Sequence, residues 1–314
     1  MQLPYIVGIG ALNLDIMCRS TAALIPQDSN PGSIAVSIGG VTHNVLENAR
    51  RLGVPVRLIS AIGDDLFAET LRKGCAQSGI PTDDLVLFTG QRSSCYLSTH
   101  EPNGEMSVAV SDMHILQNLT PAHLAKKAEL LNGAAAILFD TGLPETVIDF
   151  LIETYGGRVP LFVDPVSTTY AHKLRRSLRG IHTIKPNILE AEILSDMKIE
   201  NKADLEEAAR RICRMGAERV FISLGREGVL YADQTGKMTS RRCRPLDRVA
   251  NATGAGDSFL GALLWAYTEG FDLEATLDAA LTAAVLTIQS EHTIRPDMSC
   301  DLLTASLPLY RENS

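Results

Sequence analysis

The sequence has few cysteines, and none of the six forms a C-x-x-C pair. The seven histidines do not gather near them, whereas zinc sites need cysteine and histidine ligands at short spacings. A chain of 314 residues can bury a large core, so this cysteine content does not indicate a disulfide scaffold. These absences argue against a zinc protein and favour reduced thiols in a cytoplasmic protein.

Long apolar runs are missing as well. No segment approaches the roughly 20 apolar residues of a transmembrane helix, and residues 1–5 do not begin a secretory signal. Positive charge is not in excess, because the formal net charge is −8. Since broad nucleic-acid surfaces are positively charged, we expect a cytoplasmic protein that binds neither membranes nor nucleic acid.

Several catalytic motifs are absent. The sequence has no Walker A motif G-x-x-x-x-G-K-[ST], no HRD and DFG set of protein kinases, and no G-x-S-x-G elbow. Gly8 and Gly10 follow an apolar segment, but Asn13 replaces the third glycine of a dinucleotide-binding turn. P-loop enzymes, protein kinases, serine hydrolases and Rossmann dehydrogenases are therefore not favoured.

What is present is an alternation of helices and strands. From residue 120 onward, helical segments precede predicted strands at 134–139, 161–163, 181–184 and 219–223. This alternation predicts an α/β domain with a doubly wound, mostly parallel sheet and ligand sites at the carboxyl ends of its strands. The pattern further predicts one strand over 56–62, one helix over 121–132, and a helix over 273–290 that closes the fold.

Four alternating segments lie outside this rhythm. They cover residues 13–18, 33–38, 94–99 and 105–110, and a Pro-Asn-Gly turn joins the last two into a hairpin. We expect a small separate sheet, from about 12–38 and 92–112, inserted into a single domain over 1–314. An isolated small sheet leaves one face and its edges uncovered, so it is the expected interface of a homodimer.

One glycine-rich motif carries a carboxylate. Gly254, Ala255 and Gly256 directly precede Asp257, and the apolar run over 258–265 predicts a helix that begins there. Glycines allow an anion to approach the backbone amides at a helix start, where the helix dipole favours it. A carboxylate in that turn can take the proton of a hydroxyl that attacks a phosphate. The alternative is a glycine-rich cap with an Asp that the dipole favours.

Three further groups have two interpretations each. Gly39 and Gly40 begin a helix with Asn44 one turn later, and Asp15 ends a glycine-rich turn; these suit a polyol, or a tight turn with a solvated carboxylate. Asn187 and Glu190 suit magnesium phosphate bound through water, or a capping box. The third group follows the strand over 219–223 and suits the phosphates or ribose of a nucleotide, or is only a turn. Its residues are Ser223, Gly225 and Gly228.

Taken together, these motifs resemble a known family. Gly39-Gly40-x-x-x-Asn44, and Thr253 through Asp257, are similar to the two signatures of the ribokinase (PfkB) family in order and separation. The resemblance extends from residue 5 to about 298. It implies a ribokinase-like fold with a β-sheet lid, and phosphorylation of an alcohol by ATP with Mg²⁺.

The resemblance also implies roles for individual residues. Asp257 is the base for the substrate hydroxyl, and Gly254, Ala255 and Gly256 form the anion hole. Glu190, with Asn187, organises Mg²⁺ and ATP through water. The substrate ribose would be bound by Asp15, Gly39, Gly40, Asn44 and Asn13. The ATP side would be lined by Asn187, Ser223, Gly225, Gly228 and Thr253.

Within the family, several stretches are similar to members that phosphorylate the 5′-hydroxyl of pseudouridine. They include 28–32, 104–113, 162–167 and 182–192. A ribokinase-like or inosine–adenosine kinase-like enzyme, and a non-catalytic nucleoside sensor, remain alternatives. Two features depart from the family pattern. Asn251 replaces an Asp of a monovalent-cation site, which leaves K⁺ activation open, and Thr42-His43 follow the Gly-Gly-Val turn.

Overall fold

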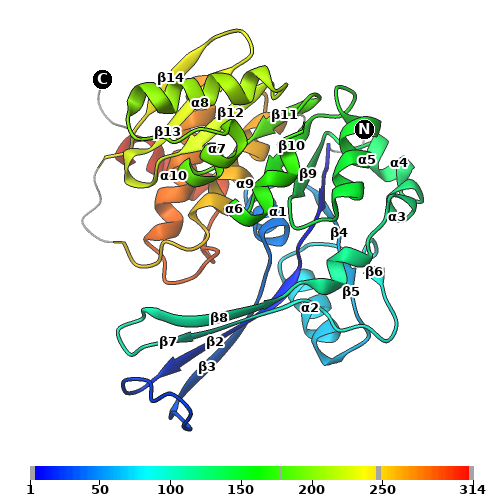
Figure 1. Ribbon diagram of the computed structural model, residues 1–314, viewed down its shortest axis with the longest axis vertical. Coiled ribbons are helices and arrows are strands. Elements are labelled where there is room, and N and C mark those ends of the chain that lie inside the picture. Colours follow the sequence, from blue (N-terminus) through cyan, green and yellow to red (C-terminus); the bar gives the residue numbers. More distant parts are fainter. Residues whose placement is uncertain (1–3, 177, 245–248, 311–314) are drawn as a thin grey trace.

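A large twisted sheet forms the centre of the protein. The computed structural model describes residues 4–176, 178–244 and 249–310. Eight strands lie in the order β14-β13-β12-β11-β10-β9-β1-β4; those from β12 to β4 are parallel, and β13 and β14 are antiparallel (Figure 1). The strands are β1 (Ile6–Ile9), β4 (Val56–Ile59), β9 (Ala136–Asp140), β10 (Leu161–Asp164), β11 (Ile181–Ile184), β12 (Arg219–Ser223), β13 (Val229–Asp233) and β14 (Met238–Arg241).

Helices cover both faces of this sheet, as the alternating pattern predicts. Strand residues such as Ala136 and Ile137 belong to opposite apolar clusters, so successive side chains are buried on both faces. One cluster contains residues of α1 (Val41–Arg51), α2 (Leu66–Gln77), α9 (Ala255–Thr268), α10 (Leu273–Ile288) and α11 (Cys300–Tyr310). The other contains residues of α3 (Pro121–Ala125), α4 (Ala128–Asn132), α5 (Glu145–Tyr155), α6 (Thr168–Ala171), α7 (Ile188–Ser195) and α8 (Lys202–Arg214), with the 3₁₀ turns η1 (His114–Asn118) and η2 (His172–Leu174).

A second sheet extends from this body. Its order is β3-β2-β7-β8, and Figure 1 shows it as a long arm below the central sheet. Its strands are β2 (Asn13–Ser20), β3 (Gly32–Gly39), β7 (Cys95–His100) and β8 (Met106–Asp112). The four segments predicted outside the α/β rhythm therefore do form a separate sheet, which we call the small sheet. A two-stranded sheet of β5 (Ala61–Ile62) and β6 (Val86–Leu87) completes the β structure of the described chain.

Three boundaries differ from the sequence-based prediction. The strand predicted over 56–62 is divided at Ser60, whose hydroxyl donates to the Gly10 carbonyl at 2.6 Å, and β5 then pairs with β6. The helix predicted over 121–132 is divided into α3 and α4 at Lys127, whose ammonium lies 2.6 Å from Asp84. Hydrogen bonds and ion pairs to distant segments cause both breaks.

The prediction that a helix over 273–290 closes the fold is wrong, because α11 follows it. Pro308 lies inside α11 and disfavours a helix in the sequence pattern. Leu303, however, is fully buried in the cluster that contains α1 and α10. Tertiary packing therefore stabilises a helix whose local propensity is weak.

Candidate active site

Asp257 lies in the first turn of α9. The N-cap of this helix is Gly254, which has a left-handed backbone (φ 83°). A Cβ on Gly254 would meet the Thr293 carbonyl oxygen at 2.0 Å, so this turn requires glycine. Within the described chain, Ser258 is the first residue of α9 whose amide donates to a backbone carbonyl, that of Gly254, at 2.9 Å. The amides that precede Ser258 are left for an anion at the positive end of the helix dipole.

Asn44 connects α1 to this turn. Its Nδ2 donates to Asp257 Oδ2 at 3.0 Å, although the two residues are 213 positions apart. Asn44 Oδ1 lies 3.2 Å from Nδ1 of the fully buried His43. Thr42 donates its hydroxyl to Asp140 at 2.6 Å. Thr42 and His43, which depart from the family pattern, thus contact the polar side chains of Asp140 and Asn44.

The acidity of Asp257 is set by its surroundings. Burial raises the pKa of Asp257 to about 7, and the negative charge of Asp164 adds to this increase. The hydrogen bond from Asn44 and the positive charge of Lys185 oppose it. A carboxyl group with a pKa near neutrality can both accept and release a proton under physiological conditions.

Lys185 is a buried cation beside Asp257. Its Nζ lies 3.2 Å from Asp164 Oδ2 and 3.2 Å from the position that a Cβ on Gly256 would occupy. Burial alone lowers the pKa of Lys185, but the carboxylates of Asp164, Glu190 and Asp257 outweigh it and raise the pKa. A charged ammonium therefore stands next to the glycine turn.

The predicted sugar-binding residues meet where β2 and β3 leave the body. The Asn13 Nδ2 donates to Asp15 Oδ1 at 2.5 Å. A Cβ on Gly39 would lie 2.2 Å from Asp15 Oδ2, and a Cβ on Gly40 would lie 2.4 Å from the Ala11 carbonyl oxygen. Burial raises the pKa of Asp15 to about 6, and the bond from Asn13 opposes this. Gly39 thus lets the chain pack directly against this carboxyl group, and Gly40 lets it pack against the Ala11 carbonyl.

Asn187 and Glu190 form the capping box of α7. Asn187 Oδ1 accepts from the Glu190 amide, and Glu190 Oε2 accepts from the Asn187 amide, both at 2.9 Å. The capping box uses Oε2 of this carboxylate, and the Glu190 side chain is buried. Burial and the charge of Asp164 raise the pKa of Glu190. An additional positive charge would relieve both effects.

The predicted ATP-binding residues lie at the carboxyl end of β12 and in the turn before α9. The Ser223 amide donates to the Pro186 carbonyl at 2.9 Å, and this bond places Ser223 beside Asn187 at the edge of the sheet. Gly225 and Gly228 have φ of 59° and 90° around the turn η3 (Gly225–Glu227), and a Cβ on Gly225 would meet nothing within 4 Å. The backbone is therefore accessible at Gly225, whereas Gly228 is buried and a Cβ there would meet the Arg241 carbonyl oxygen at 2.0 Å.

The loop before α9 is held by Asn251. Its Oδ1 accepts from the Thr253 amide at 2.9 Å, and its Nδ2 donates to the Glu291 carbonyl at 3.3 Å. Thr253 itself is exposed next to Gly254. The neutral Asn251 thus joins two loops by direct hydrogen bonds, at the position where the family pattern has a carboxylate.

Three charged residues of this site are absent from the sequence-based prediction. Asp140 and Asp164 are the last residues of β9 and β10 and lie opposite each other in register, and Lys185 directly follows β11. Each is a polar residue that ends an apolar strand. The rule that ligands bind at the carboxyl ends of parallel strands is the signal that could have identified them.

No group of three or more His, Cys, Asp or Glu side chains in 4–176, 178–244 and 249–310 is arranged to hold a metal ion directly. Over the same ranges, every helix is too short or too polar to cross a membrane.

Comparison with known proteins agrees with this geometry. Residues 3–299 match the profile of the pfkB family carbohydrate kinases. The chain is 35% identical to the pseudouridine kinase of Escherichia coli (strain K12) over 296 aligned residues, and this alignment covers 94% of each protein. It is 28% identical to the guanosine-inosine kinase of Exiguobacterium acetylicum, over 93% of this chain and 97% of that protein.

Solved structures show the same fold. A carbohydrate kinase from Agrobacterium tumefaciens has a TM-score of 0.86 at 26% identity and covers 99% of both chains. The ribokinase of Arabidopsis thaliana, complexed with ribose and ATP, has a TM-score of 0.87 at 21% identity, over 98% of this chain and 99% of that one. The predicted ribokinase-like fold is confirmed. The chain belongs to the pfkB family of carbohydrate kinases and is a phosphotransferase that acts on a hydroxyl group.

Proposed function

We propose that this protein is a cytoplasmic kinase that transfers the γ-phosphoryl group of ATP to the 5′-hydroxyl of pseudouridine. The observation that carries the reaction type is the placement of Asp257, with a pKa of about 7, in the first turn of α9. The 35% identity to a pseudouridine kinase supports the choice of nucleoside. The absence of disulfides among its six cysteines agrees with a reducing compartment.

The residues of the site supply the two needs of phosphoryl transfer. Asp257 accepts the proton of the attacking hydroxyl as its oxygen bonds to phosphorus and the bond to the ADP oxygen breaks. The amides of Ala255 and Gly256 face the negative charge on the transferred group, as an anion hole. Lys185 adds a fixed positive charge beside Gly256. Asn44 holds Asp257 in place.

Magnesium fits this site only through water. When bound, Mg²⁺ neutralises charge on the phosphates of ATP. The described chain offers no set of three direct ligands, but Oε1 of Glu190 is the carboxylate oxygen that the capping box does not use and would be the ligand of a hydrated cation. Glu190, with Asn187, would hold it.

Glu190→Gln tests this assignment without removing the helix cap, since Gln also completes a capping box. We expect an unchanged melting temperature, and a Mg²⁺ concentration for half-maximal activity that is about 10–100-fold higher. Initial rates measured across a magnesium titration check this. Glu192→Gln, two residues along α7, is the control and should match the wild type. An E190Q enzyme with the wild-type magnesium requirement contradicts the assignment.

The choice of nucleoside is tested by a substrate panel. We expect kcat/KM for pseudouridine to exceed the values for uridine, inosine, adenosine and ribose, with mass spectrometry showing one added phosphate. Faster turnover of ribose or a purine nucleoside would favour a ribokinase-like or inosine–adenosine kinase-like activity, and the specific substrate proposed here would be wrong. No turnover with any of them, together with nucleoside binding, would favour a sensor.

The small sheet has one polar face. In its register, Asp15 lies beside Ser37 and Tyr96, and the next row on the same face contains Ser98. We propose that this face covers the nucleoside, because it carries Asp15. The segment 28–30 does not share this position: Asn30 binds Ile25 and the Asp28 carbonyl within an exposed turn. On the face that carries Asp15, the candidate for contact with the base is Ser98, whose hydroxyl lies 3.0 Å from His100 Nε2.

Asp15→Ala is expected to raise the KM for nucleoside about 10–100-fold, because hydroxyl groups that the carboxylate binds would lose a partner worth ~1–3 kcal/mol. The KM for ATP should stay unchanged. Initial-rate kinetics with each substrate varied in turn measure both. Asp28→Ala, which removes an exposed carboxylate from the turn between β2 and β3, is the control. An unchanged nucleoside KM in the Asp15 variant would move the sugar site elsewhere.

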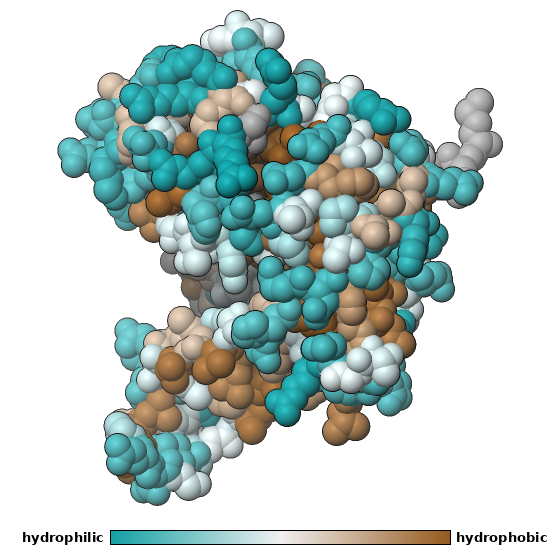
Figure 2. Space-filling view, turned by 45° about the vertical axis from the view of Figure 1, so that its right-hand side comes forward, coloured by the Kyte–Doolittle hydropathy of each residue, from teal (hydrophilic) through white to brown (hydrophobic). Residues whose placement is uncertain are grey.

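The opposite face of the small sheet is apolar and uncovered at its outer end. Cross-strand register aligns Val36, Ile16, Leu97 and Val110 in one row, and Ile34 lies in the next. Ile34 is 71% exposed and Val110 62% exposed. In Figure 2 brown side chains gather along this arm, while its tip is teal. Exposed apolar areas of this kind mark interaction sites, and we propose that two copies of the chain pair through it.

Ile34→Lys places a charge on this face, in the edge strand β3, and is expected to convert a dimer into a monomer, because an unpaired charge cannot be buried between two apolar sheets. Light scattering coupled to size-exclusion chromatography measures the mass. The control is Ser33→Lys, whose side chain leaves the same strand on the other face and should leave the dimer intact. A wild-type protein that is monomeric at micromolar concentration contradicts the proposal.

A further inference from the structure

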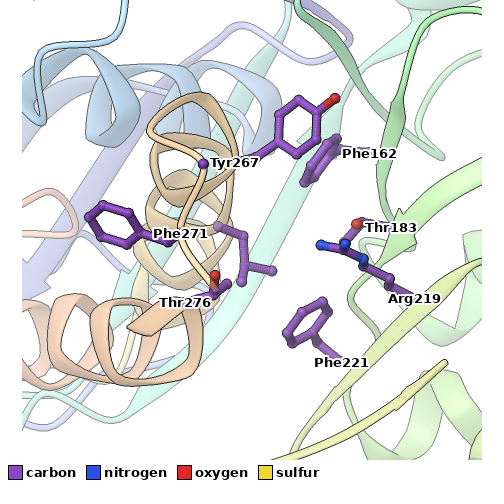
Figure 3. A pocket seen from close by; sticks show the side chains of 9 residues that line it. Phe162, Thr183, Arg219, Phe221, Tyr267, Phe271 and Thr276 are labelled. Carbon is purple, nitrogen blue, oxygen red and sulfur yellow. The ribbon is translucent and has the colours of Figure 1, made fainter. Parts of the chain in front are cut away.

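A cavity lies at the edge of the large sheet opposite the active site. Its volume is about 180 Å³, far above the ~10–15 Å³ that one water molecule requires. Residues of β10, β11 and β12 form one wall, and the end of α9 and the start of α10 form the other (Figure 3). Tyr267 stands ten residues after Asp257 on α9, which corresponds to about 15 Å along the helix. The cavity is therefore separate from the phosphoryl-transfer site.

Aromatic rings dominate the lining. Phe162 and Tyr267 meet edge to face with centroids 5.4 Å apart, and both contact the ring of His182 at 5.2 Å. Phe221 lies on the other side of the space, and Phe271 stands at its rim, 37% exposed (Figure 3). Phe162 and Phe221 are 2% and 1% exposed and form the floor of the space, whereas Tyr267 is half-buried, so a further planar ring would lie over this floor, between Tyr267 and Phe271.

The same wall carries one cation. Phe162, Thr183 and Arg219 are aligned across β10, β11 and β12, and Figure 3 shows the Arg219 guanidinium reaching between Phe162 and Phe221. Arg219 forms no ion pair with any described residue. Its cross-strand neighbour Asp233 instead accepts hydrogen bonds from Tyr231 and Thr235.

The other titratable groups at the cavity are neutral at physiological pH. Burial, with the charge of Arg219 adding to it, lowers the pKa of His182 to about 4. Burial raises the pKa of Tyr267. Glu218 is the nearest acid in sequence and acts on Tyr267, but it is not part of the lining. The chemistry of the cavity is thus that of aromatic rings, two threonine hydroxyls and one guanidinium.

We propose that this cavity is a second ligand site, for a small planar aromatic carboxylate whose ring lies against Tyr267 and Phe271 and whose carboxylate pairs with the exposed Arg219. A guanidinium binds a carboxylate through two parallel hydrogen bonds, and aromatic rings select a flat apolar body. The volume is below that of drug-sized sites, so it suits a single ring. The assignment is independent of which alcohol the enzyme phosphorylates.

Benzoate is the probe that tests this site. Saturation-transfer NMR on the full-length protein should show benzoate bound, and benzamide, the neutral molecule of the same shape, bound at least about tenfold more weakly. Arg219→Gln should weaken benzoate binding at least about tenfold. Arg158→Gln is the matched control, because Arg158 is an exposed arginine just before β10 and outside the cavity.

The outcomes separate clearly. Binding of benzoate that depends on Arg219, does not depend on Arg158 and exceeds that of benzamide supports the site. The proposal is overturned if benzoate does not bind at concentrations up to about 10 mM, the range in which a one-ring ligand is detected. It is also overturned if the R219Q variant or benzamide binds equally well. The benzamide comparison uses the wild-type protein, so it holds even if R219Q proves unstable.

Discussion

Asp257→Asn is expected to lower kcat by about 10²–10⁴-fold and to leave nucleoside affinity nearly unchanged. The amide is nearly isosteric with the carboxylate, and its oxygen can still accept the hydrogen bond that Asn44 donates. Only the ability to take the proton of the attacking hydroxyl is lost. Steady-state kinetics give kcat, and titration calorimetry with the nucleoside gives the affinity. A variant that keeps more than about a tenth of the wild-type kcat would show that Asp257 is not the base.

The pH dependence supplies an independent check on this residue. Since burial raises the pKa of Asp257 to about 7 and the carboxylate is the active form, wild-type kcat/KM should fall about tenfold per pH unit below 7 and level off above it. The pKa of Asp15, about 6, steepens the fall at lower pH. In the Asp257→Asn variant the step near pH 7 should disappear. A step that persists there belongs to another group.

Lys185→Met is expected to have the second large effect, on both activity and stability. It leaves the buried carboxylates of Asp164 and Glu190 beside Asp257 without their cation. Breaking a buried ion pair by removing one partner costs about 3–5 kcal/mol of unfolding free energy. Loss of a fixed charge near the transferred group lowers kcat by about 10²–10³-fold. Denaturant unfolding and steady-state kinetics measure the two effects.

A double variant separates these two effects. Asp164→Asn with Lys185→Met removes both charges of the pair, so most of the stability should return while kcat stays low. The pH step should also move upward in the single Lys185 variant, because Lys185 lowers the pKa of Asp257. If the double variant regains wild-type kcat, Lys185 acts only through the stability of the fold, and the proposed effect of its charge on the transferred group is wrong.

Sequence patterns predicted much of the architecture. The alternation of apolar segments gave the order of strands and helices from residue 120 onward, and the four segments outside it form the small sheet. The sequence patterns gave wrong boundaries where a contact with a distant segment affects the local structure, as at Ser60, Lys127 and α11. Periodicity reports only which face of a segment is apolar, and not which element covers it.

The sequence by itself determined the glycine turn with Asp257, because left-handed φ at Gly254 and the absence of a side chain at Gly256 are properties of residue type. It also determined the capping box of Asn187 and Glu190, which is a local hydrogen-bonded pair. Only the tertiary structure decided that Asn44 bonds to Asp257, and that Lys185 and Asp164 lie beside them. Parallel strands bring their carboxyl ends to one edge of the sheet, so residues from segments far apart in the chain form one site, and burial there sets the pKa of each. The spacing of residues along the chain shows neither which strand ends lie close together nor how deeply each side chain is buried.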